Sequence, residues 1–291
     1  MSAVRLREVL PRDGLQDYAV HVPTAAKIAI VERLHAAGLR WIEVTSMVHP
    51  KWVPQFSDAE EVLAAVGGLD GLVASVFVPN RRGLDRAVGN GADEVSLAVA
   101  ASDTLSRENF AMDRAEALAE ILWVIGEADA AGVRSTVTIG AAFGCPYEGA
   151  VAAQDVVDLA RALADSAVSA VLVADTIGCA TAGQVPELVA QVVAAVSDRP
   201  IGVHLHGAGA TADVVRAIGV GARIVDASTT GLGGCPFVPA APGNVATELV
   251  LAGLDLEGVS TGLDLRALTT AARDIDKLLQ EVRDHADTEP R

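Results

Sequence analysis

Cysteine and positive charge are both scarce in this 291-residue sequence, and each shortage excludes a class of protein. There are only three cysteines, Cys145, Cys179 and Cys235. This odd, low number argues against a disulfide framework and is typical of a protein of the reducing cytoplasm. The 22 Lys and Arg residues are outnumbered by 38 Asp and Glu, which gives a net charge of −16. Such an excess of negative charge argues against nucleic-acid binding, so an anionic ligand would need a local arginine cluster or a helix N-terminus.

Long apolar runs and lysines are scarce as well. Periodic apolar sequence begins at Val4 with no basic segment before it, and no stretch is apolar for long enough to span a bilayer. We therefore expect neither a signal peptide nor a membrane partner. The chain holds only three lysines, Lys27, Lys51 and Lys277, and none lies on a predicted strand. That absence argues against Schiff-base chemistry and against a carbamylated-lysine metal site.

What the sequence does contain is a regular alternation of two patterns. Short β-rich apolar runs alternate with Ala- and Leu-rich helical stretches along the whole chain. The predicted strands are 4–9, 41–45, 72–78, 94–99, 135–141, 170–174, 201–206 and 223–227. The predicted helices lie near 24–37, 57–66, 80–90, 113–131, 154–166, 183–197, 211–220 and 244–254, with a further one over 264–283.

Eight strand–helix units without a break in composition predict a (β/α)8 TIM barrel. We expect one catalytic domain over residues 1–291, with the barrel over about 4–254 and a C-terminal helical extension over about 264–285. A doubly wound sheet is the alternative fold. It is the weaker one, because no G-x-G-x-x-G motif follows an early strand. In a TIM barrel the functional side chains lie at the carboxyl ends of the strands.

Two histidines stand at alternate positions of the seventh predicted strand, in the sequence Val203-His204-Leu205-His206. Alternate side chains of a strand point to the same face, so both imidazoles project together and form half of a site for a divalent metal. An isolated H-x-H motif is equally consistent with one core histidine and one surface histidine, because the motif is short. Other strand ends must therefore supply further ligands.

The first and second strand ends supply charged residues. Arg12 and Asp13 precede Gly14 directly after the first strand. Asp is a hard oxygen ligand and Arg is a fixed cationic fork, although an Asp-Gly pair is also common in plain surface turns. Glu43 is embedded in the apolar second strand, where a carboxylate needs a partner. It is either a member of a structural ion pair, with Arg12 as a candidate, or a catalytic carboxylate.

Two further strand ends carry candidate residues. Asn80, Arg81 and Arg82 open a helix after the third strand. This arrangement suits a phosphate, although a solvated basic turn is the more frequent explanation. Asp175 ends the sixth strand, where it is a candidate base or a partner for a histidine.

A loop rich in glycine and proline, residues 231–244, follows the eighth strand and carries Cys235 and Asn244. Glycines around a polar residue allow hinge motion, so one interpretation is a lid that carries a functional thiol. The other is a Gly/Pro linker with an inert buried cysteine. Asp13, His204, His206 and Asn244 together offer one carboxylate, two imidazoles and an amide oxygen. That donor set suits Mg²⁺, Mn²⁺, Co²⁺ or Zn²⁺ with open positions for substrate oxygens.

Several longer strings resemble hydroxymethylglutaryl-CoA lyases, in the same order and at similar spacing from about Val4 to Leu254. The strings are Pro11-Arg12-Asp13-Gly14-Leu15-Gln16, Ile42-Glu43-Val44-Thr45-Ser46, Pro50-Lys51-Trp52-Val53-Pro54-Gln55, Gly144-Cys145-Pro146-Tyr147-Glu148-Gly149, Asp175-Thr176-Ile177-Gly178, Gly231-Leu232-Gly233-Gly234-Cys235-Pro236 and Gly243-Asn244-Val245-Ala246-Thr247-Glu248. The resemblance implies a TIM barrel of the lyase/synthase superfamily. It also implies a metal-dependent retro-Claisen cleavage of a 3-hydroxyacyl-CoA into acetyl-CoA and a ketoacid, here acetoacetate.

The same resemblance implies cofactors, partners and residue roles. It favours Mg²⁺ or Mn²⁺ as the cation, with Co²⁺ and Zn²⁺ as further options, and it implies a cytoplasmic homodimer and a role in leucine degradation. The implied metal ligands are Asp13, His204, His206 and Asn244. Arg12 is implied to stabilise the thioester enolate and Cys235 to act as the acid of a mobile loop. Glu43 and Asp175 are implied to be supporting carboxylates. Charge alone assigns Asn80, Arg81 and Arg82 to the CoA phosphates.

Two segments depart from the family pattern. Gly207-Ala208-Gly209-Ala210-Thr211-Ala212 lacks the acidic residue that normally follows the H-x-H motif, and this connection is shorter, so we expect it to set the substrate preference. Ala240-Ala241-Pro242 stands where the family usually has Gly and Ser, which predicts a stiffer lid. A Claisen-condensing synthase and a non-catalytic acyl-CoA-binding barrel are the alternative functions. The Cys235 loop and the absence of a C-terminal regulatory domain weigh against the synthase.

Overall fold

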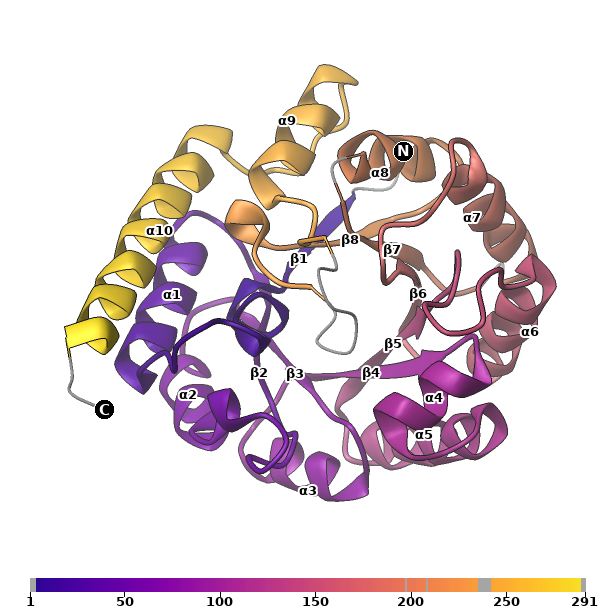
Figure 1. Ribbon diagram of the computed structural model, residues 1–291, viewed down its shortest axis with the longest axis horizontal. Helices are drawn as coiled ribbons and strands as arrows, with labels where there is room; N and C mark the ends of the chain where they lie inside the picture. Colours follow the sequence, from indigo (N-terminus) through magenta and orange to yellow (C-terminus); the bar gives the residue numbers. More distant parts are fainter. Residues whose placement is uncertain (1–3, 197, 208, 235–241, 289–291) are drawn as a thin grey trace.

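The computed structural model describes residues 4–196, 198–207, 209–234 and 242–288. At its centre eight strands form a closed barrel in sequence order, each parallel to its neighbours. Figure 1 looks down this barrel and shows the helices as an outer ring. The strands are β1 Arg5–Glu8, β2 Trp41–Ser46, β3 Val73–Phe77, β4 Glu94–Ala100, β5 Arg134–Gly140, β6 Ala170–Asp175, β7 Ile201–Leu205 and β8 Ile224–Ala227. The helices are α1 Thr24–Ala36, α2 Ala59–Val66, α3 Arg81–Gly89, α4 Asp103–Phe110, α5 Arg114–Ala130, α6 Ala153–Ala164, α7 Gln184–Ala195, α8 Ala210–Gly219, α9 Thr247–Leu256 and α10 Leu265–Thr288.

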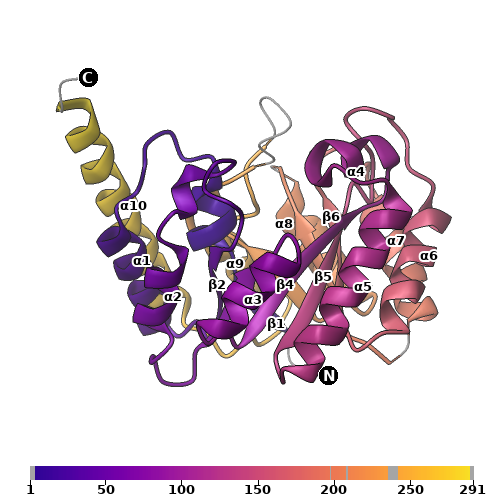
Figure 2. The same cartoon turned by 90° about the horizontal axis from the view of Figure 1, so that it is seen from below.

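The predicted TIM barrel is confirmed, and each predicted strand is present to within one residue at each end. The doubly wound sheet is wrong, because β1 pairs with β8 and closes the barrel. Several short elements were not predicted, among them the 3₁₀ turns η2 (Pro54–Phe56) and η3 (Thr229–Gly231). The segment after β1, which could have been a plain surface turn, is a π-helical turn, η1 (Leu10–Gly14). Helix α4 was not expected. In Figure 2, α4 lies at the end of the barrel opposite the N-terminus, where the carboxyl ends of the strands open.

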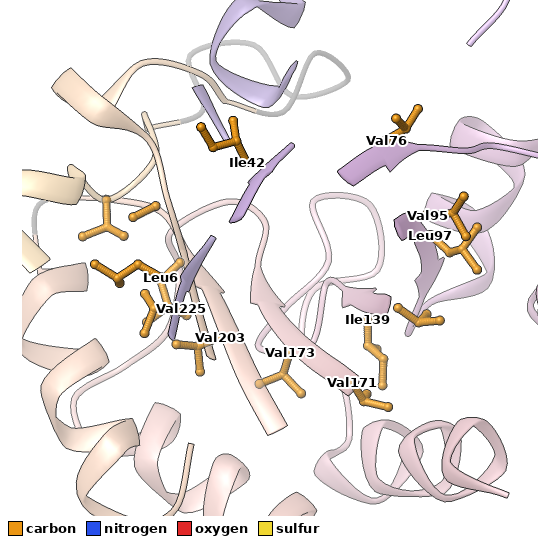
Figure 3. Close-up of a cluster of buried hydrophobic side chains, with 14 of the residues drawn as sticks. Leu6, Ile42, Val76, Val95, Leu97, Ile139, Val171, Val173, Val203 and Val225 are labelled. Carbon is orange, nitrogen blue, oxygen red and sulfur yellow. The ribbon is translucent and has the colours of Figure 1, made fainter. Parts of the chain in front are cut away.

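Branched aliphatic side chains fill the space between the strands and the surrounding helices. One continuous cluster joins strand residues to helix residues such as Ile30 and Leu34 of α1. Ten of its strand members are labelled in Figure 3: Leu6, Ile42, Val76, Val95, Leu97, Ile139, Val171, Val173, Val203 and Val225. Parallel strands covered by helices need such residues, and each buried side chain contributes about 1.5–3 kcal/mol. This packing makes the barrel a firm support for loops at its rim.

The inside of the barrel has a different lining. Trp41, Ala170, Leu172 and Ile224 form a separate apolar cluster near the amino ends of β2, β6 and β8. Gly202 on β7 leaves room for this cluster, because a Cβ there would lie 2.8 Å from both Ile224 Cβ and Leu172 Cγ. The apolar cluster closes one end of the lumen. Buried charged residues, among them Arg7 and Asp226, occupy the lumen beyond this cluster, and Glu94 accepts a hydrogen bond from Trp41 Nε1 at 2.8 Å.

The predicted C-terminal helix is present as α10, which packs against α1 and α9. Figure 1 shows α10 beside α1 at the edge of the molecule. Leu268, Ile275 and Leu279 of α10 are buried, and the Tyr18 hydroxyl donates a hydrogen bond to the Leu279 carbonyl at 3.1 Å. No helix within the described ranges is long and apolar enough to cross a membrane.

Candidate metal centre and active site

Segments at the carboxyl ends of β1, β7 and β8 bring the predicted metal ligands together. Asp13 lies in η1 directly after β1, and His204 is on β7 with His206 next to the strand end. Asn244 follows β8 and pairs with His206 in an isolated antiparallel bridge. Ligand atoms of Asp13, His204 and His206 all lie within 4.8 Å of one another. These three residues form a candidate metal centre, and Asn244 adjoins it.

The distances within this group suit a cation between imidazole nitrogens and a carboxylate oxygen. Nε2 of His204 lies 2.9 Å from Nε2 of His206 and 3.8 Å from Oδ2 of Asp13. Nδ2 of Asn244 donates to the same Oδ2 at 2.7 Å, and turning this amide over would point its oxygen into the group. Two ring nitrogens at hydrogen-bond distance have one hydrogen between them, so at least one lone pair faces inward. A mixed nitrogen and oxygen donor set of this kind fits a divalent cation.

Burial and neighbouring charges set the protonation of the group. Burial acts to raise the pKa of Asp13, but the charges of Arg12, His204 and His206 outweigh it, so that pKa is lowered. Burial, and then the proximity of His204, lowers the pKa of His206 to about 4. Burial acts to lower the pKa of His204, but Asp226 and Asp13 outweigh it and raise that pKa. A cation bound here therefore meets a carboxylate and a neutral His206.

Arg12 connects the candidate metal centre to a buried carboxylate. Its Nε donates to Oε2 of Glu43 at 2.6 Å and its Nη1 donates to Oδ1 of Asp13 at 2.6 Å. Glu43 on β2 is fully buried and also accepts a hydrogen bond from the Ser96 hydroxyl on β4. The Arg12 guanidinium carbon lies 4.6 Å from the ring centroid of Phe77. The ion pair between Arg12 and Glu43, one of the two alternatives for Glu43, is thus present, and it fixes the guanidinium beside the candidate metal ligands.

A further acid at the site, Asp226, is not indicated by the sequence patterns above. It lies on β8 with 3% of its surface exposed, and its Oδ2 is 3.2 Å from Nδ1 of His204. Burial acts to raise the pKa of Asp226, but Arg7 and His204 outweigh it and lower the pKa to about 2. The available signal is the one that identified Glu43, a carboxylate inside an apolar strand, here Ile224-Val225-Asp226-Ala227.

Asp175, at the end of β6, organises the loop that follows it. Its carboxylate oxygens accept hydrogen bonds from the backbone N–H groups of Cys179 at 3.0 Å and Ala180 at 2.9 Å. The carboxylate that faces the Nδ1 atom of His204 belongs to Asp226 instead. The carboxylate that contacts a histidine is therefore Asp226, on β8 next to the strand of His204, and not Asp175.

The segments on either side of the candidate centre are closely packed. Gly178 has a φ of +64°, and a Cβ there would lie 2.6 Å from Cγ of Pro242. The backbone N–H of Gly207 donates to the Gly243 carbonyl at 3.0 Å, so the connection after β7 lies against the segment after β8. Cys235 lies outside the residues that the structure describes.

The residues assigned to CoA phosphates lie at the N-terminus of α3, and two of them have local partners. The Asn80 side chain accepts a hydrogen bond from the backbone N–H of Gly83 at 3.1 Å and caps the helix. Nε of Arg81 donates to Glu120 at 3.0 Å, and the Arg81 guanidinium lies 3.9 Å from the ring centroid of Trp123. Arg82 is exposed. These contacts attach Asn80 and Arg81 to α3 and α5.

Comparison with known proteins identifies relatives over almost the whole chain. A family model described as HMGL-like matches residues 3–275. Hydroxymethylglutaryl-CoA lyase YngG of Bacillus subtilis is 36% identical over 276 residues, which cover 94% of this chain and 92% of that protein. The mitochondrial hydroxymethylglutaryl-CoA lyase of Gallus gallus is 38% identical over 91% of this chain and 90% of its own. The structure of an HMG-CoA lyase from Acinetobacter baumannii, in complex with coenzyme A and 3-methylmalate, superposes with a TM-score of 0.90 at 33% identity, covering 96% of this chain and 92% of that one.

Proposed function

This chain belongs to the HMGL-like family and is a lyase, and we propose that it cleaves 3-hydroxy-3-methylglutaryl-CoA, or a related 3-hydroxyacyl-CoA, to acetyl-CoA and acetoacetate or the analogous ketoacid. The observation that carries the proposal is the convergence of Asp13, His204 and His206 beside the Arg12–Glu43 pair at the barrel mouth. Coenzyme A in the Acinetobacter structure supports an acyl-CoA as the class of substrate.

We propose that Asp13, His204, His206 and Asn244 hold a divalent cation. A divalent cation bound there would hold the tertiary hydroxyl and a carboxylate oxygen of the substrate and lower the hydroxyl pKa. The two histidines and Asp13 supply the ligand atoms that already lie within 4.8 Å of one another. Rotation about the Cβ–Cγ bond would turn the Asn244 amide over and present its oxygen to the cation. The mixture of oxygen and imidazole ligands, together with the resemblance, supports Mg²⁺ or Mn²⁺ over Co²⁺ or Zn²⁺.

Arg12 has the position and charge to stabilise the leaving enolate. Once a base has taken up the hydroxyl proton, the electron pair on oxygen forms the ketone and the carbon–carbon bond breaks. Its electrons pass to the thioester, which becomes an enolate. Nε and Nη1 of Arg12 are held by Glu43 and Asp13, so the guanidinium keeps one orientation and need not reorganise as that charge develops. Glu43 is therefore proposed as the residue that orients Arg12.

Cys235 is proposed as the acid that completes the reaction. Its thiol would give a proton to the methylene carbon of the enolate, which releases acetyl-CoA. The proposal rests on the glycine- and proline-rich sequence around Cys235 and on the family resemblance. Asp175 is proposed as a supporting carboxylate, and its bonds to the Cys179 and Ala180 backbone support a role in shaping the mouth of the site.

The remaining assignments are proposals of the same kind. Arg82, which is exposed, is a better candidate for the CoA phosphates than Asn80 and Arg81, which have local partners. The small residues of 207–212 are proposed to set the preference among acyl groups. A homodimer, a cytoplasmic location and a role in leucine degradation are proposed from the family resemblance of the sequence motifs alone.

An assay of acetyl-CoA release tests the proposal. Purified protein with Mg²⁺ or Mn²⁺ is offered a panel of 3-hydroxyacyl-CoAs, and we expect release from 3-hydroxy-3-methylglutaryl-CoA or a near analogue. His204→Ala should abolish release, while His285→Ala, on the exposed end of α10, should not change it. Cys235→Ala should lower kcat by about 100-fold or more, as expected for loss of a general acid, and the exposed Cys179 serves as its control in Cys179→Ala. No release from any substrate would refute the lyase assignment, and full activity of either active-site variant would refute that residue's role.

A further inference from the structure

Three charged or ionisable side chains lie side by side across three adjacent strands inside the barrel. Arg7 on β1 is in register with Asp226 on β8, and Asp226 is in register with His204 on β7. All three are nearly inaccessible, with 2%, 3% and 9% of their surfaces exposed. The arrangement crosses the seam where β1 and β8 close the barrel. It reaches from the middle of the lumen to the candidate metal centre.

Both oxygens of Asp226 are occupied in this arrangement. Nε of Arg7 donates to Oδ1 at 2.8 Å and Nη2 of Arg7 donates to Oδ2 at 2.7 Å, which is a two-pronged contact of fixed geometry. Oδ2 also lies 3.2 Å from Nδ1 of His204. Nη1 of Arg7 donates to the Thr136 hydroxyl at 2.6 Å and lies 3.5 Å from Oε1 of Glu94 without a hydrogen bond to it. Asp226 therefore has little freedom to turn.

This geometry determines which nitrogen of His204 faces the candidate metal centre. An ionised carboxylate only accepts hydrogen bonds, so Nδ1 of His204 must carry the hydrogen that Asp226 accepts. The neutral ring then has its lone pair on Nε2, the atom that lies 2.9 Å from His206 and 3.8 Å from Asp13. Histidines that bind metals are commonly oriented by a carboxylate on the other ring nitrogen.

We propose that Asp226, clamped by Arg7, is a positioning residue that fixes the tautomer and the ring orientation of His204 for a divalent cation. This inference rests on the proposed metal site and extends it from the ligands to the residues behind them. It assigns a role to a buried ion pair that would otherwise serve only the fold. Glu94 provides the contrast, because it contacts Arg7 but bonds to Trp41 at 2.8 Å and Ser75 at 3.0 Å, not to Asp226.

The substitution Asp226→Asn is the sharpest test, because it keeps the shape of the side chain and changes one hydrogen-bond acceptor into a donor. If its amide nitrogen replaces Oδ2, it faces N–H groups of both Arg7 and His204, and His204 must move its hydrogen to Nε2. If the nitrogen replaces Oδ1, it faces the Nε–H of Arg7 and the clamp is broken. Both orientations damage the arrangement that presents Nε2 of His204.

The first measurement is Mn²⁺ binding to the full chain by titration calorimetry, without substrate. We expect Asp226→Asn to weaken binding by about 10–100-fold, the usual loss when the partner of a metal-binding histidine is removed. Arg7→Lys should give a smaller loss, since it keeps the charge without the fork. Glu94→Gln should lower the melting temperature while leaving the Mn²⁺ affinity at the wild-type value. Wild-type affinity in folded Asp226→Asn protein would overturn the role of Asp226, and wild-type affinity in Arg7→Lys would overturn the clamp.

The second measurement reports the tautomer directly. ¹⁵N NMR of the cation-free protein, at a pH where its imidazoles are neutral, separates protonated from unprotonated ring nitrogens, and His204→Ala assigns the His204 signals. We expect the hydrogen on Nδ1 in the wild type and a shift towards Nε2 in Asp226→Asn. An unchanged His204 tautomer together with an unchanged Mn²⁺ affinity in Asp226→Asn would overturn the inference. Failure of the metal site itself is distinguishable, because His204→Ala would then bind Mn²⁺ as tightly as the wild type.

Discussion

The backbone of Gly233 lies close to two of the candidate metal ligands, Asp13 and Asn244. Its φ is +105°, and a Cβ there would lie 2.5 Å from Nδ2 of Asn244 and 2.8 Å from the Asp13 carbonyl oxygen. We expect Gly233→Ala to displace the Asn244 amide and weaken Mn²⁺ binding. It should also destabilise the fold by about 1–3 kcal/mol, since alanine disfavours this backbone conformation. Calorimetric Mn²⁺ titration and chemical denaturation measure the two effects.

Gly258 provides the matched control for that substitution. It also has a positive φ, +70°, but a Cβ there would meet nothing within 4 Å. Gly258→Ala should therefore cost stability through the backbone alone and leave Mn²⁺ affinity unchanged. Equal Mn²⁺ affinities in the two variants would show that the space beside Asn244 does not matter for the site.

At the same scale, the sequence predicts the residues of the site better than it predicts their partners. The H-x-H motif and strand-end polarity were enough to bring Asp13, His204 and His206 to one place. Asp226 was not predicted, because its significance comes from Arg7 and His204. Those neighbours are 219 and 22 residues away in the chain and become adjacent only through strand register. The ends of strands can be predicted from a sequence. Contacts between side chains of neighbouring strands inside the lumen can be identified only once the register of the closed barrel is known.

At the scale of the elements, one buried carboxylate, that of Glu8, connects the end of β1 to the segments that follow β8. Glu8 has no exposed surface and accepts hydrogen bonds from the backbone N–H groups of Leu10 at 3.0 Å and Thr229 at 2.9 Å. It also accepts from the hydroxyls of Thr229 at 2.6 Å and Thr247 at 2.8 Å. Glu8 therefore joins β1, η1, the segment after β8 and the first turn of α9. This junction sets where η1 presents Asp13.

Removing that junction should destabilise the molecule strongly. We expect Glu8→Ala to lower the free energy of unfolding by about 3 kcal/mol or more, because buried donors lose their acceptor and a cavity forms. Glu8→Gln should cost much less, since an amide keeps the shape and the two threonine hydroxyls can turn to accept from it. Urea denaturation compares both with Glu257→Ala, an exposed glutamate at the end of α9. An equal loss in the alanine and glutamine variants would mean that charge, and not hydrogen bonding, holds the junction.

The elements themselves were predictable where hydrophobic periodicity was strong. Strands such as β6 (Ala170–Asp175) and β7 (Ile201–Leu205) are buried along their whole length and are rich in branched apolar residues, which made them predictable. The strand β1, with the sequence Arg-Leu-Arg-Glu, is more polar, and its prediction depended on the flanking Val4 and Val9. Helix α4 escaped prediction because its sequence, DTLSRENF, buries only Leu105 and Ser106 and has almost no apolar stripe. The turn η1 escaped because Pro11 and Asp13-Gly14 are typical of an irregular turn. It becomes helical where the Val9 carbonyl accepts from the backbone of Arg12, Asp13 and Gly14.

For the molecule as a whole, the lumen changes from apolar to charged along the barrel axis. Trp41, Leu172 and Ile224 fill one end, Arg7 and Asp226 cross the middle, and the candidate metal centre occupies the other end. The closed fold and the polar mouth follow from sequence, because eight repeated units leave few other arrangements. The contacts that connect the buried charged side chains to the barrel mouth cannot be predicted from the sequence, since they depend on which side chains cross the lumen. Arg7, for example, extends from β1 to Thr136 on β5.

The proposed metal ligands come from both ends of the chain, which makes a prediction about global stability. Asp13 follows β1, whereas His204, His206 and Asn244 follow or belong to β7 and β8, so a cation would hold the closing seam of the barrel. A ligand that binds only the folded state at 100 times its Kd stabilises by about 2.7 kcal/mol. For a chain of this size that corresponds to a rise of roughly 4–5 °C in Tm.

Thermal unfolding in chelator and in excess Mn²⁺ measures this rise. We expect it in the wild type and its loss in His204→Ala, because one of the ligands that closes the seam is then missing. The control matters because the chain has a net charge of −16, and an acidic surface attracts cations without a specific site. Such surface attraction would raise Tm equally in both proteins and would weaken as ionic strength increases. An equal rise in His204→Ala would therefore assign the stabilisation to the surface and contradict a metal centre at the barrel seam.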